Sequence, residues 1–140
     1  MHYTTIMFIK EGVIVIFNND SMEPIYVQIS KWLENQILSG SISADEKMYS
    51  QYQLADMYNI NPATAGKGLT ILFDENILYK KRGLGMFVSP QAKDIIFKRR
   101  KNQTLRHLVL DLISEANRLN VSEKELFDLI KTIKTECEGE

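Results

Sequence analysis

The sequence has few of the residues on which most catalytic and metal sites depend. Its 140 residues include one cysteine, Cys137, and two histidines, His2 and His107, which lie far apart. One thiol cannot form an internal disulfide, and no Cys/His cluster has metal-site spacing, so a reducing cytoplasm is expected and Cys137 receives no role. Asp111 and Glu115 form an i,i+4 pair that is more typical of a solvated face than of a metal site. No cofactor is expected, and the lack of a Ser/His/Asp set or a Gly-rich phosphate loop argues against an enzyme.

Long hydrophobic runs are also missing. The apolar runs Ile6–Ile9 and Val13–Phe17 are too short to span a bilayer or to form the apolar part of a secretory signal. The first 21 residues are interpreted as an N-terminal extension, either an edge hairpin or a disordered tail. A third alternative is that Lys10-Glu11-Gly12 is encoded by a ribosome-binding sequence and that translation begins at a downstream valine codon.

Charge of one sign is not in excess over the whole chain, but it is unevenly distributed. The net charge is −1, and charged residues make up 25% of the sequence. Residues 61–106 hold 10 Lys and Arg against 3 Asp and Glu, whereas the segments before and after each carry a net charge of −4. A local basic patch with acidic surroundings fits nucleic-acid binding, although a solvated basic face would give the same count.

A first amphipathic helix is predicted after Met22. Pro24 suits its start, and Ile25, Ile29, Leu33 and Ile37 recur at helical spacing, with Trp32 beside them. Gly40 follows the last apolar residue and suits the helix C-terminus. We interpret the stripe and Trp32 as core.

The stretch from Ser50 to Ser89 predicts two short helices, a tight turn and a basic hairpin. Ser50 can cap a helix over 51–58, whose Leu54, Ala55 and Tyr58 face inward, and the turn is Asn59-Ile60-Asn61-Pro62. Asn61 can cap a third helix that Pro62 begins and that extends to about residue 75. The hairpin pairs residues 78–81 with 86–88 through Arg82-Gly83-Leu84-Gly85, whose glycines supply positive φ. Together these elements form a winged helix-turn-helix.

The third helix is the expected recognition helix. Ala63, Thr64 and Lys67 lie on its first turns, where Thr64 and Lys67 can bond phosphates or base edges. Gly66 and Gly68 each cost up to ~1 kcal/mol in a helix relative to Ala, which indicates close approach to another group. DNA and a neighbouring helix both remain candidates for that group, and helix packing explains Gly68 equally well.

About 50 residues after Ser89 read as all-helical. A basic run, 98–101, precedes an apolar stripe that ends at Leu119; Asn120 and Val121 break it, and Ser122 opens a final helix as a capping box. The two helices are too short to enclose a core, so they pack on the first domain or on another copy, and we favour another copy. The predicted dimer contacts are Leu105, Leu108, Leu112, Leu119, Leu126, Leu129, Ile130 and Ile133. The expected fold class is mainly α with a small β-hairpin: a winged helix-turn-helix domain over 22–89 and a helical dimerisation hairpin over 90–140.

The segment from Pro24 to Ser89 resembles the GntR family of bacterial transcription regulators. The resemblance is carried by residues 24–29, Gly40, Ser50 with Leu54-Ala55, Asn61 with Thr64, and Gly83, Gly85, Phe87 and Val88. The short two-helix tail is similar to that of the YtrA subfamily, which lacks a large effector domain. The resemblance implies a dimeric DNA-binding regulator, often a repressor beside ABC-transporter genes.

The sequence departs from the family pattern at positions that matter for DNA contact. Tyr49 replaces the usual proline before the cap serine, and Tyr52, Pro62 and Gly66 stand where arginine is common. Tyr52 can still donate its hydroxyl to a phosphate, and base readout is expected to shift toward Thr64, Lys67 and the wing. The predicted DNA-binding residues are Ser50, Tyr52, Asn61, Ala63, Thr64, Lys67, Lys80, Lys81, Arg82 and Gly83.

These observations favour a sequence-specific DNA-binding regulator, with a repressor as the expected form. It would bind double-stranded DNA at a palindromic operator as a cytoplasmic homodimer. The alternative is a winged helix used for protein–protein contact without specific DNA binding. A small-molecule effector cannot be identified from the sequence.

Overall fold

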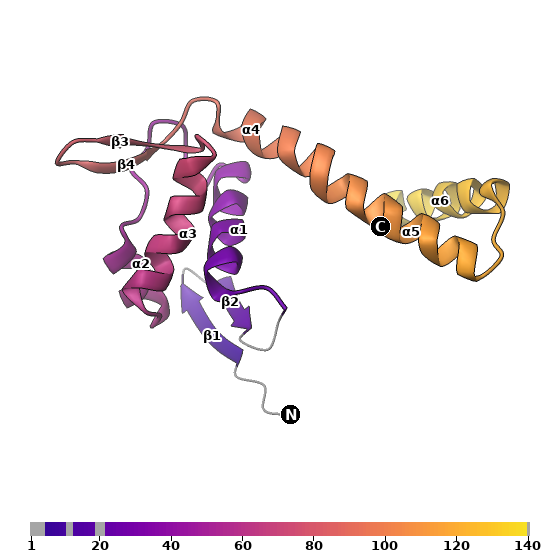
Figure 1. Ribbon diagram of the computed structural model, residues 1–140, viewed down its shortest axis with the longest axis horizontal. Helices are drawn as coiled ribbons and strands as arrows, with labels where there is room; N and C mark the ends of the chain where they lie inside the picture. The colour runs from indigo at the N-terminus through magenta and orange to yellow at the C-terminus, as the bar shows by residue number, and fades with distance from the viewer. Residues whose placement is uncertain (1–4, 11–12, 19–21, 140) are drawn as a thin grey trace. The chain divides into compact units, whose positions relative to one another are not determined.

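The computed structural model describes residues 5–10, 13–18 and 22–139, and the chain forms two compact units, Met1–Phe97 and Lys98–Glu140 (Figure 1). Each unit is built from short elements that follow one another along the chain. The first contains β1 (Thr5–Lys10), β2 (Val13–Asn18), α1 (Ile25–Leu38), α2 (Gln51–Tyr58), α3 (Pro62–Asp74), β3 (Leu78–Lys81), β4 (Gly85–Val88) and most of α4 (Ala92–Arg99). The second contains a π-helical segment, η1 (Arg100–Leu105), α5 (Arg106–Arg118) and α6 (Glu123–Glu138).

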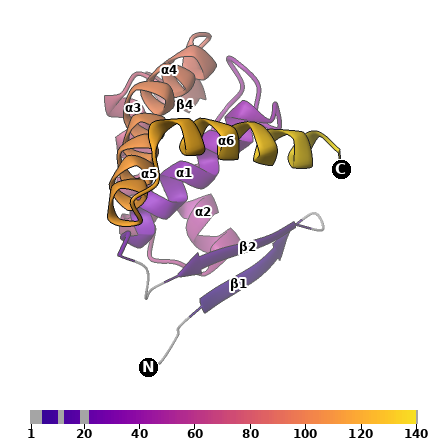
Figure 2. The ribbon, with the colours of Figure 1, turned by 90° about the vertical axis from the view of Figure 1, so that its right-hand side faces the viewer.

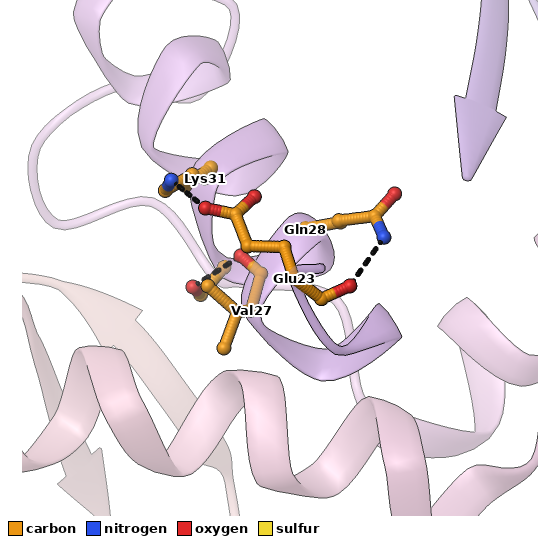
Figure 3. Close-up of polar contacts among 5 residues, drawn as sticks. Glu23, Val27, Gln28 and Lys31 are labelled. Atoms are coloured by element: carbon orange, nitrogen blue, oxygen red, sulfur yellow. Dashed lines mark hydrogen bonds and ion pairs between the residues drawn. The ribbon is translucent and has the colours of Figure 1, made fainter. Parts of the chain in front are cut away.

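Helix α1 begins without a side-chain cap on its first N–H groups. Pro24 is the N-cap residue, and the backbone N–H groups of Val27 and Gln28 donate to its carbonyl at 3.1 and 3.2 Å. The Gln28 side chain donates to the Glu23 carbonyl at 2.9 Å, and Lys31 pairs with the Glu23 carboxylate (Figure 3). These contacts fold the entering chain back on the first turn of α1.

The core of the first unit lies among its three helices. Ile29, Leu33 and Ile37 of α1 are buried, as the helical spacing predicts, and they meet Leu54 of α2 and Leu72 of α3. Trp32 is partly buried, and its ring meets the Tyr58 ring edge-on with centroids 5.0 Å apart. The interpretation of Trp32 as a packing residue is therefore confirmed. Gly40 ends the helix region at φ +83°, also as predicted.

The N-terminal segment forms an antiparallel hairpin, which was one of the two structural alternatives that the sequence left open. Strands β1 and β2 pair in register from Thr5↔Asn18 to Lys10↔Val13, and β2 lies against α1 (Figure 2). Phe17 is 2% exposed, and its ring meets Tyr58 edge-on at 5.5 Å. The hairpin therefore contributes an aromatic side chain to the core.

Helices α2 and α3 begin as the sequence predicts. The Gln53 N–H donates to Ser50 Oγ at 3.1 Å, and the Ser50 N–H donates to Gln53 Oε1 at 2.8 Å, which completes a capping box. The Ala63 N–H donates to Asn61 Oδ1 at 2.8 Å, and Pro62 is the first residue of α3. Leu54, Tyr58, Leu69 and Leu72 are buried, whereas Ala55 and Phe73 are only half-buried.

The hairpin β3–β4 pairs Leu78 with Val88 and Lys81 with Gly85, so β4 starts one residue earlier than expected. A third extended segment, which the sequence did not indicate, runs beside β4. The Met48 N–H donates to the Met86 carbonyl at 2.8 Å, and the Asp45 N–H donates to the Val88 carbonyl at 2.7 Å. This segment ties the connection between α1 and α2 to the wing.

The second unit is helical throughout its described length. Asn120 adopts φ +57° between α5 and α6, and Ser122 Oγ accepts from the Glu125 N–H at 3.2 Å. The predicted break and the serine cap are therefore confirmed, although the Ser122 cap is not a full capping box. The six-residue π-helical segment was not predicted. Ala116, at 7% exposure, is the only buried residue among the described residues of this unit. Within the described part of the chain, no helix has the length and apolar character needed to cross a membrane.

Candidate nucleic-acid interface

The predicted DNA-binding residues all lie in the first unit, on three neighbouring elements. Ser50 and Tyr52 are at the start of α2, four residues lie at the start of α3, and the rest lie in the wing, β3–β4. Figure 1 shows α2 and the wing on the side of α3 that faces away from α1. Tyr52 is 69% exposed, so its hydroxyl is free to approach a ligand at this surface.

The first turns of α3 carry mostly small side chains. Ala63 and Lys67 are exposed and one helical turn apart, and Thr64 is half-buried. The Lys67 ammonium lies 5.8 Å from the centroid of the Tyr26 ring of α1, within cation–π range. Because Ala63 has only a methyl group, the α3 backbone can come close to a large ligand at this point.

The two glycines of α3 have different neighbours. A Cβ atom at Gly68 would lie 2.9 Å from the Tyr26 carbonyl oxygen and 3.1 Å from Ile29 Cγ2, so Gly68 permits α1 and α3 to pack closely. A Cβ atom at Gly66 would lie 2.9 Å from Gln51 Oε1, at the far end of a flexible side chain. The packing explanation is therefore confirmed for Gly68, whereas Gly66 is matched to a polar side chain.

Two lysine ammonium groups of the wing lie over aromatic rings. The Lys80 ammonium lies 4.2 Å from the Phe73 ring centroid, and the Lys81 ammonium lies 4.5 Å from that of Phe87. The Tyr79 and Phe87 rings are stacked, with centroids 5.8 Å apart and an interplanar angle of 25°. These rings restrict the two lysines before any ligand arrives.

The tip of the wing is open. Arg82, Gly83 and Leu84 are exposed, and Gly83 adopts φ +76°. Among the residues that the structure describes, Arg82 makes no ion pair and no ring contact. Its guanidinium is therefore available for a bidentate contact with a phosphate.

Two residues at this surface were missed by sequence reasoning. Lys47 lies in the extended segment beside β4, where its Cε would be 3.2 Å from a Cβ at Gly85, and it adds a fourth lysine or arginine to the wing. Gln51 lies over Gly66. The pairing of Lys47 with the wing has no local sequence signal, whereas an unexplained helix glycine was a signal for Gln51.

Within the ranges that the structure covers, no group of three or more His, Cys, Asp or Glu side chains could hold a metal ion. His107 and Asp111 lie 3.8 Å apart as an exposed i,i+4 pair on α5. The basic run 98–101 belongs to the second unit, and a role for it in DNA binding stays a prediction.

A capped helix-turn-helix followed by a basic hairpin that packs beside the second helix defines a winged helix-turn-helix protein. The predicted resemblance to GntR-family regulators, and to YtrA among them, is confirmed by comparison with known proteins. The chain is 29% identical over 119 residues to the HTH-type transcriptional repressor YtrA of Bacillus subtilis (strain 168), covering 85% of this chain and 91% of YtrA. No family model matches the sequence.

A second relative matches only through the winged domain. The HTH-type transcriptional repressor NagR of Bacillus subtilis (strain 168) is 36% identical over 72 residues, which are 51% of this chain and 30% of NagR. The chain thus spans less than a third of NagR's length.

Solved structures agree with the winged helix-turn-helix fold. A putative transcriptional regulator of the GntR family from Bacteroides thetaiotaomicron superposes with a TM-score of 0.70 at 27% identity, covering 81% of this chain and 98% of that one. BusR of S. agalactiae, in complex with its busAB promoter DNA, superposes with a TM-score of 0.51 at 25% identity, covering 84% of this chain and 58% of BusR.

Proposed function

We propose that the protein is a sequence-specific DNA-binding transcription repressor that binds a palindromic operator as a homodimer. The observation that carries the proposal is a helix-turn-helix whose α3 exposes Ala63 and Lys67 on its first turns, followed directly by a wing with Lys80 and Lys81 on β3 and Arg82 at its tip. A helix of this kind enters the major groove, and a basic wing contacts the adjacent backbone or minor groove. The repressor YtrA, which aligns over most of its length, and the promoter complex of BusR support the same role.

The second unit supports the homodimer. Eleven large apolar side chains of this unit are at least 38% exposed: Leu105, Leu108, Val109, Leu110, Leu112, Ile113, Leu119, Phe127, Leu129, Ile130 and Ile133. All but one of the eight predicted dimer contacts are among them; Leu126 is half-buried. So many exposed large apolar side chains on two short helices are typical of a protein–protein interface, and a two-fold dimer would pair each recognition helix with one half-site.

The test uses the full-length protein and duplex DNA from upstream of its own gene. We expect a mobility shift that weakens steeply as salt rises, because phosphate contacts release counterions, and a footprint with two-fold symmetry. Sedimentation should give twice the monomer mass. A shift that is absent, or equal on random DNA at every salt concentration, would favour the alternative of a protein–protein interaction module.

A further inference from the structure

The first residue of α2, Gln51, lies across the partly exposed face of α3. A Cβ atom at Gly66 would be 2.9 Å from Gln51 Oε1, 3.4 Å from its Cδ and 3.8 Å from its Cβ. The carboxamide therefore occupies the space that a side chain at position 66 would take. Any residue other than glycine at position 66 would displace it.

The backbone of Gln51 is positioned by the capping box, and its side chain packs against α3. Its backbone follows Ser50, whose hydroxyl and N–H are both engaged in the capping box with Gln53. Its side chain is half-buried against α3. Gly66 lies three residues after Ala63 and directly before Lys67, so Gln51 borders the exposed face of the recognition helix.

The chemistry of this group matches one base. A glutamine carboxamide offers an acceptor oxygen and a donor nitrogen side by side, and adenine presents an N6–H₂ donor beside an N7 acceptor in the major groove. Guanine presents two acceptors and cytosine a donor alone, so neither uses both groups. We infer that Gln51 is a specificity-determining residue that hydrogen-bonds to an adenine next to the bases contacted by Ala63 and Lys67. Glycine at position 66 leaves the space that the Gln51 side chain occupies. The inference rests on the proposed function.

The experiment is selection of preferred sites from a library of random duplexes by the full-length protein and its variants. For Gln51→Ala we expect one position of each half-site to lose its preference for adenine by about tenfold, which is about 1.4 kcal/mol. The other positions should be unchanged. For Gln51→Glu, whose carboxylate only accepts, the same position should change to cytosine, whose N4–H₂ is a donor.

Gly66→Ala provides a second, independent test. The new methyl group would push the Gln51 carboxamide away, so this variant should lose the same adenine preference while melting at or above the wild-type temperature. The double variant with Gln51→Ala should show no further change in preference, because both substitutions remove one interaction. Gln53→Ala is the matched control: it removes a capping contact and should lower the melting temperature without changing the selected sequence.

The possible results separate this inference from the proposed function. If the wild-type protein selects no sequence, the proposed function fails. If the wild-type protein selects a site and Gln51→Ala or Gly66→Ala selects the same one, only the reading by Gln51 is overturned. A loss of equal size on every duplex would place Gln51 on a phosphate and would also overturn it.

Discussion

The Tyr79 hydroxyl donates a hydrogen bond to Asp45 Oδ1 at 2.8 Å, joining strand β3 to the connection that follows α1. Asp45 is itself held by its N–H, which donates to the Val88 carbonyl of β4, and it adopts φ +62°. The Tyr79 ring stacks on Phe87, whose ring lies under the Lys81 ammonium. The hydrogen bond between Tyr79 and Asp45 therefore fastens β3 to the connection after α1, next to the Phe87 ring that the Lys81 ammonium contacts.

This contact should make the wing sensitive to alkaline pH. The hydrogen bond to Asp45, with smaller effects from desolvation and the carboxylate charge, raises the pKa of Tyr79 above its ordinary value of 10.0. The neutral hydroxyl donates and the phenolate cannot, so this stabilisation is fully present below pH 10 and falls as the pH rises through the raised pKa. We expect one tyrosine that ionises above pH 10 in an ultraviolet absorbance titration of the wild type to be missing in Tyr79→Phe.

Asp45→Asn is the matched control for this titration. It keeps an acceptor for the hydroxyl but removes the negative charge, so Tyr79 should ionise at a lower pH than in the wild type. If Tyr79→Phe removes no tyrosine that ionises above pH 10, the hydrogen bond does not raise the pKa of Tyr79.

The two glycines of α3 should respond differently to the same substitution. A methyl group at Gly68 would meet backbone, the Tyr26 carbonyl oxygen at 2.9 Å, so α1 and α3 would have to separate. We expect Gly68→Ala to lower the free energy of unfolding by about 1–3 kcal/mol. At Gly66 only the end of Gln51 has to move, and the helix gains up to ~1 kcal/mol from the loss of a glycine. Denaturant unfolding of both variants measures the difference, and equal changes would contradict it.

The N-terminal hairpin should contribute to the stability of the winged domain through Phe17. Its ring is 2% exposed and meets Tyr58 edge-on, so truncation would leave a cavity beside Tyr58. We expect Phe17→Ala to lower the free energy of unfolding by about 3 kcal/mol or more. Met22→Ala is the control, because Met22 is fully exposed and its truncation should change stability by less than about 0.5 kcal/mol. No loss with Phe17→Ala would show that the hairpin is dispensable.

Local signals in the sequence were sufficient to predict most of the winged domain. The caps at Ser50 and Asn61 and the turn at Gly83 depend on neighbouring residues only, so their chemistry is readable in order along the chain. The extended segment beside β4 was missed because its hydrogen bonds, such as Met48 to Met86, join residues far apart in the sequence. The same limit hid Lys47 as a wing residue.

The candidate site was predicted less completely than the fold. Lys80 and Lys81 were identified from their charge, but their aromatic partners depend on which strand and helix meet in space. The role of Gly66 was left open between close approach and packing, because the side chain that faces it comes from another helix. A glycine in a helix indicates that another group lies close by, but the sequence does not show which group that is.

The exposed apolar side chains of α5 and α6 give a test of the dimer. Ile130 is 38% exposed on α6, in the set that we propose to pair with a second copy. We expect Ile130→Asp to sediment as a monomer and to bind operator DNA on the order of 100-fold more weakly, because the two half-sites are then no longer bound together. Thr132→Asp adds the same charge on the same helix at an exposed polar position and should remain dimeric. A dimeric Ile130→Asp would place the interface elsewhere.

The wing gives a test that separates Arg82 from the lysines. The Lys80 ammonium lies over the Phe73 ring and must share or leave it to reach a phosphate, whereas Arg82 makes no ion pair or ring contact with the described residues. Arg82→Ala should therefore weaken binding to every duplex by about tenfold, or about 1.4 kcal/mol, and Lys80→Ala by less. Because a phosphate contact is lost, the slope of log affinity against log salt should fall by about 1 per protomer for Arg82→Ala.

The control for this measurement is Lys124→Ala, which removes an exposed lysine from α6 in the second unit. It should leave both the affinity and the salt slope unchanged. If Arg82→Ala changes affinity for one sequence only, then Arg82 reads a base rather than a phosphate, since a backbone contact carries no sequence information. If Arg82→Ala and Lys124→Ala behave alike, Arg82 does not contact DNA, and the phosphate contacts of the wing must come from Lys80 and Lys81.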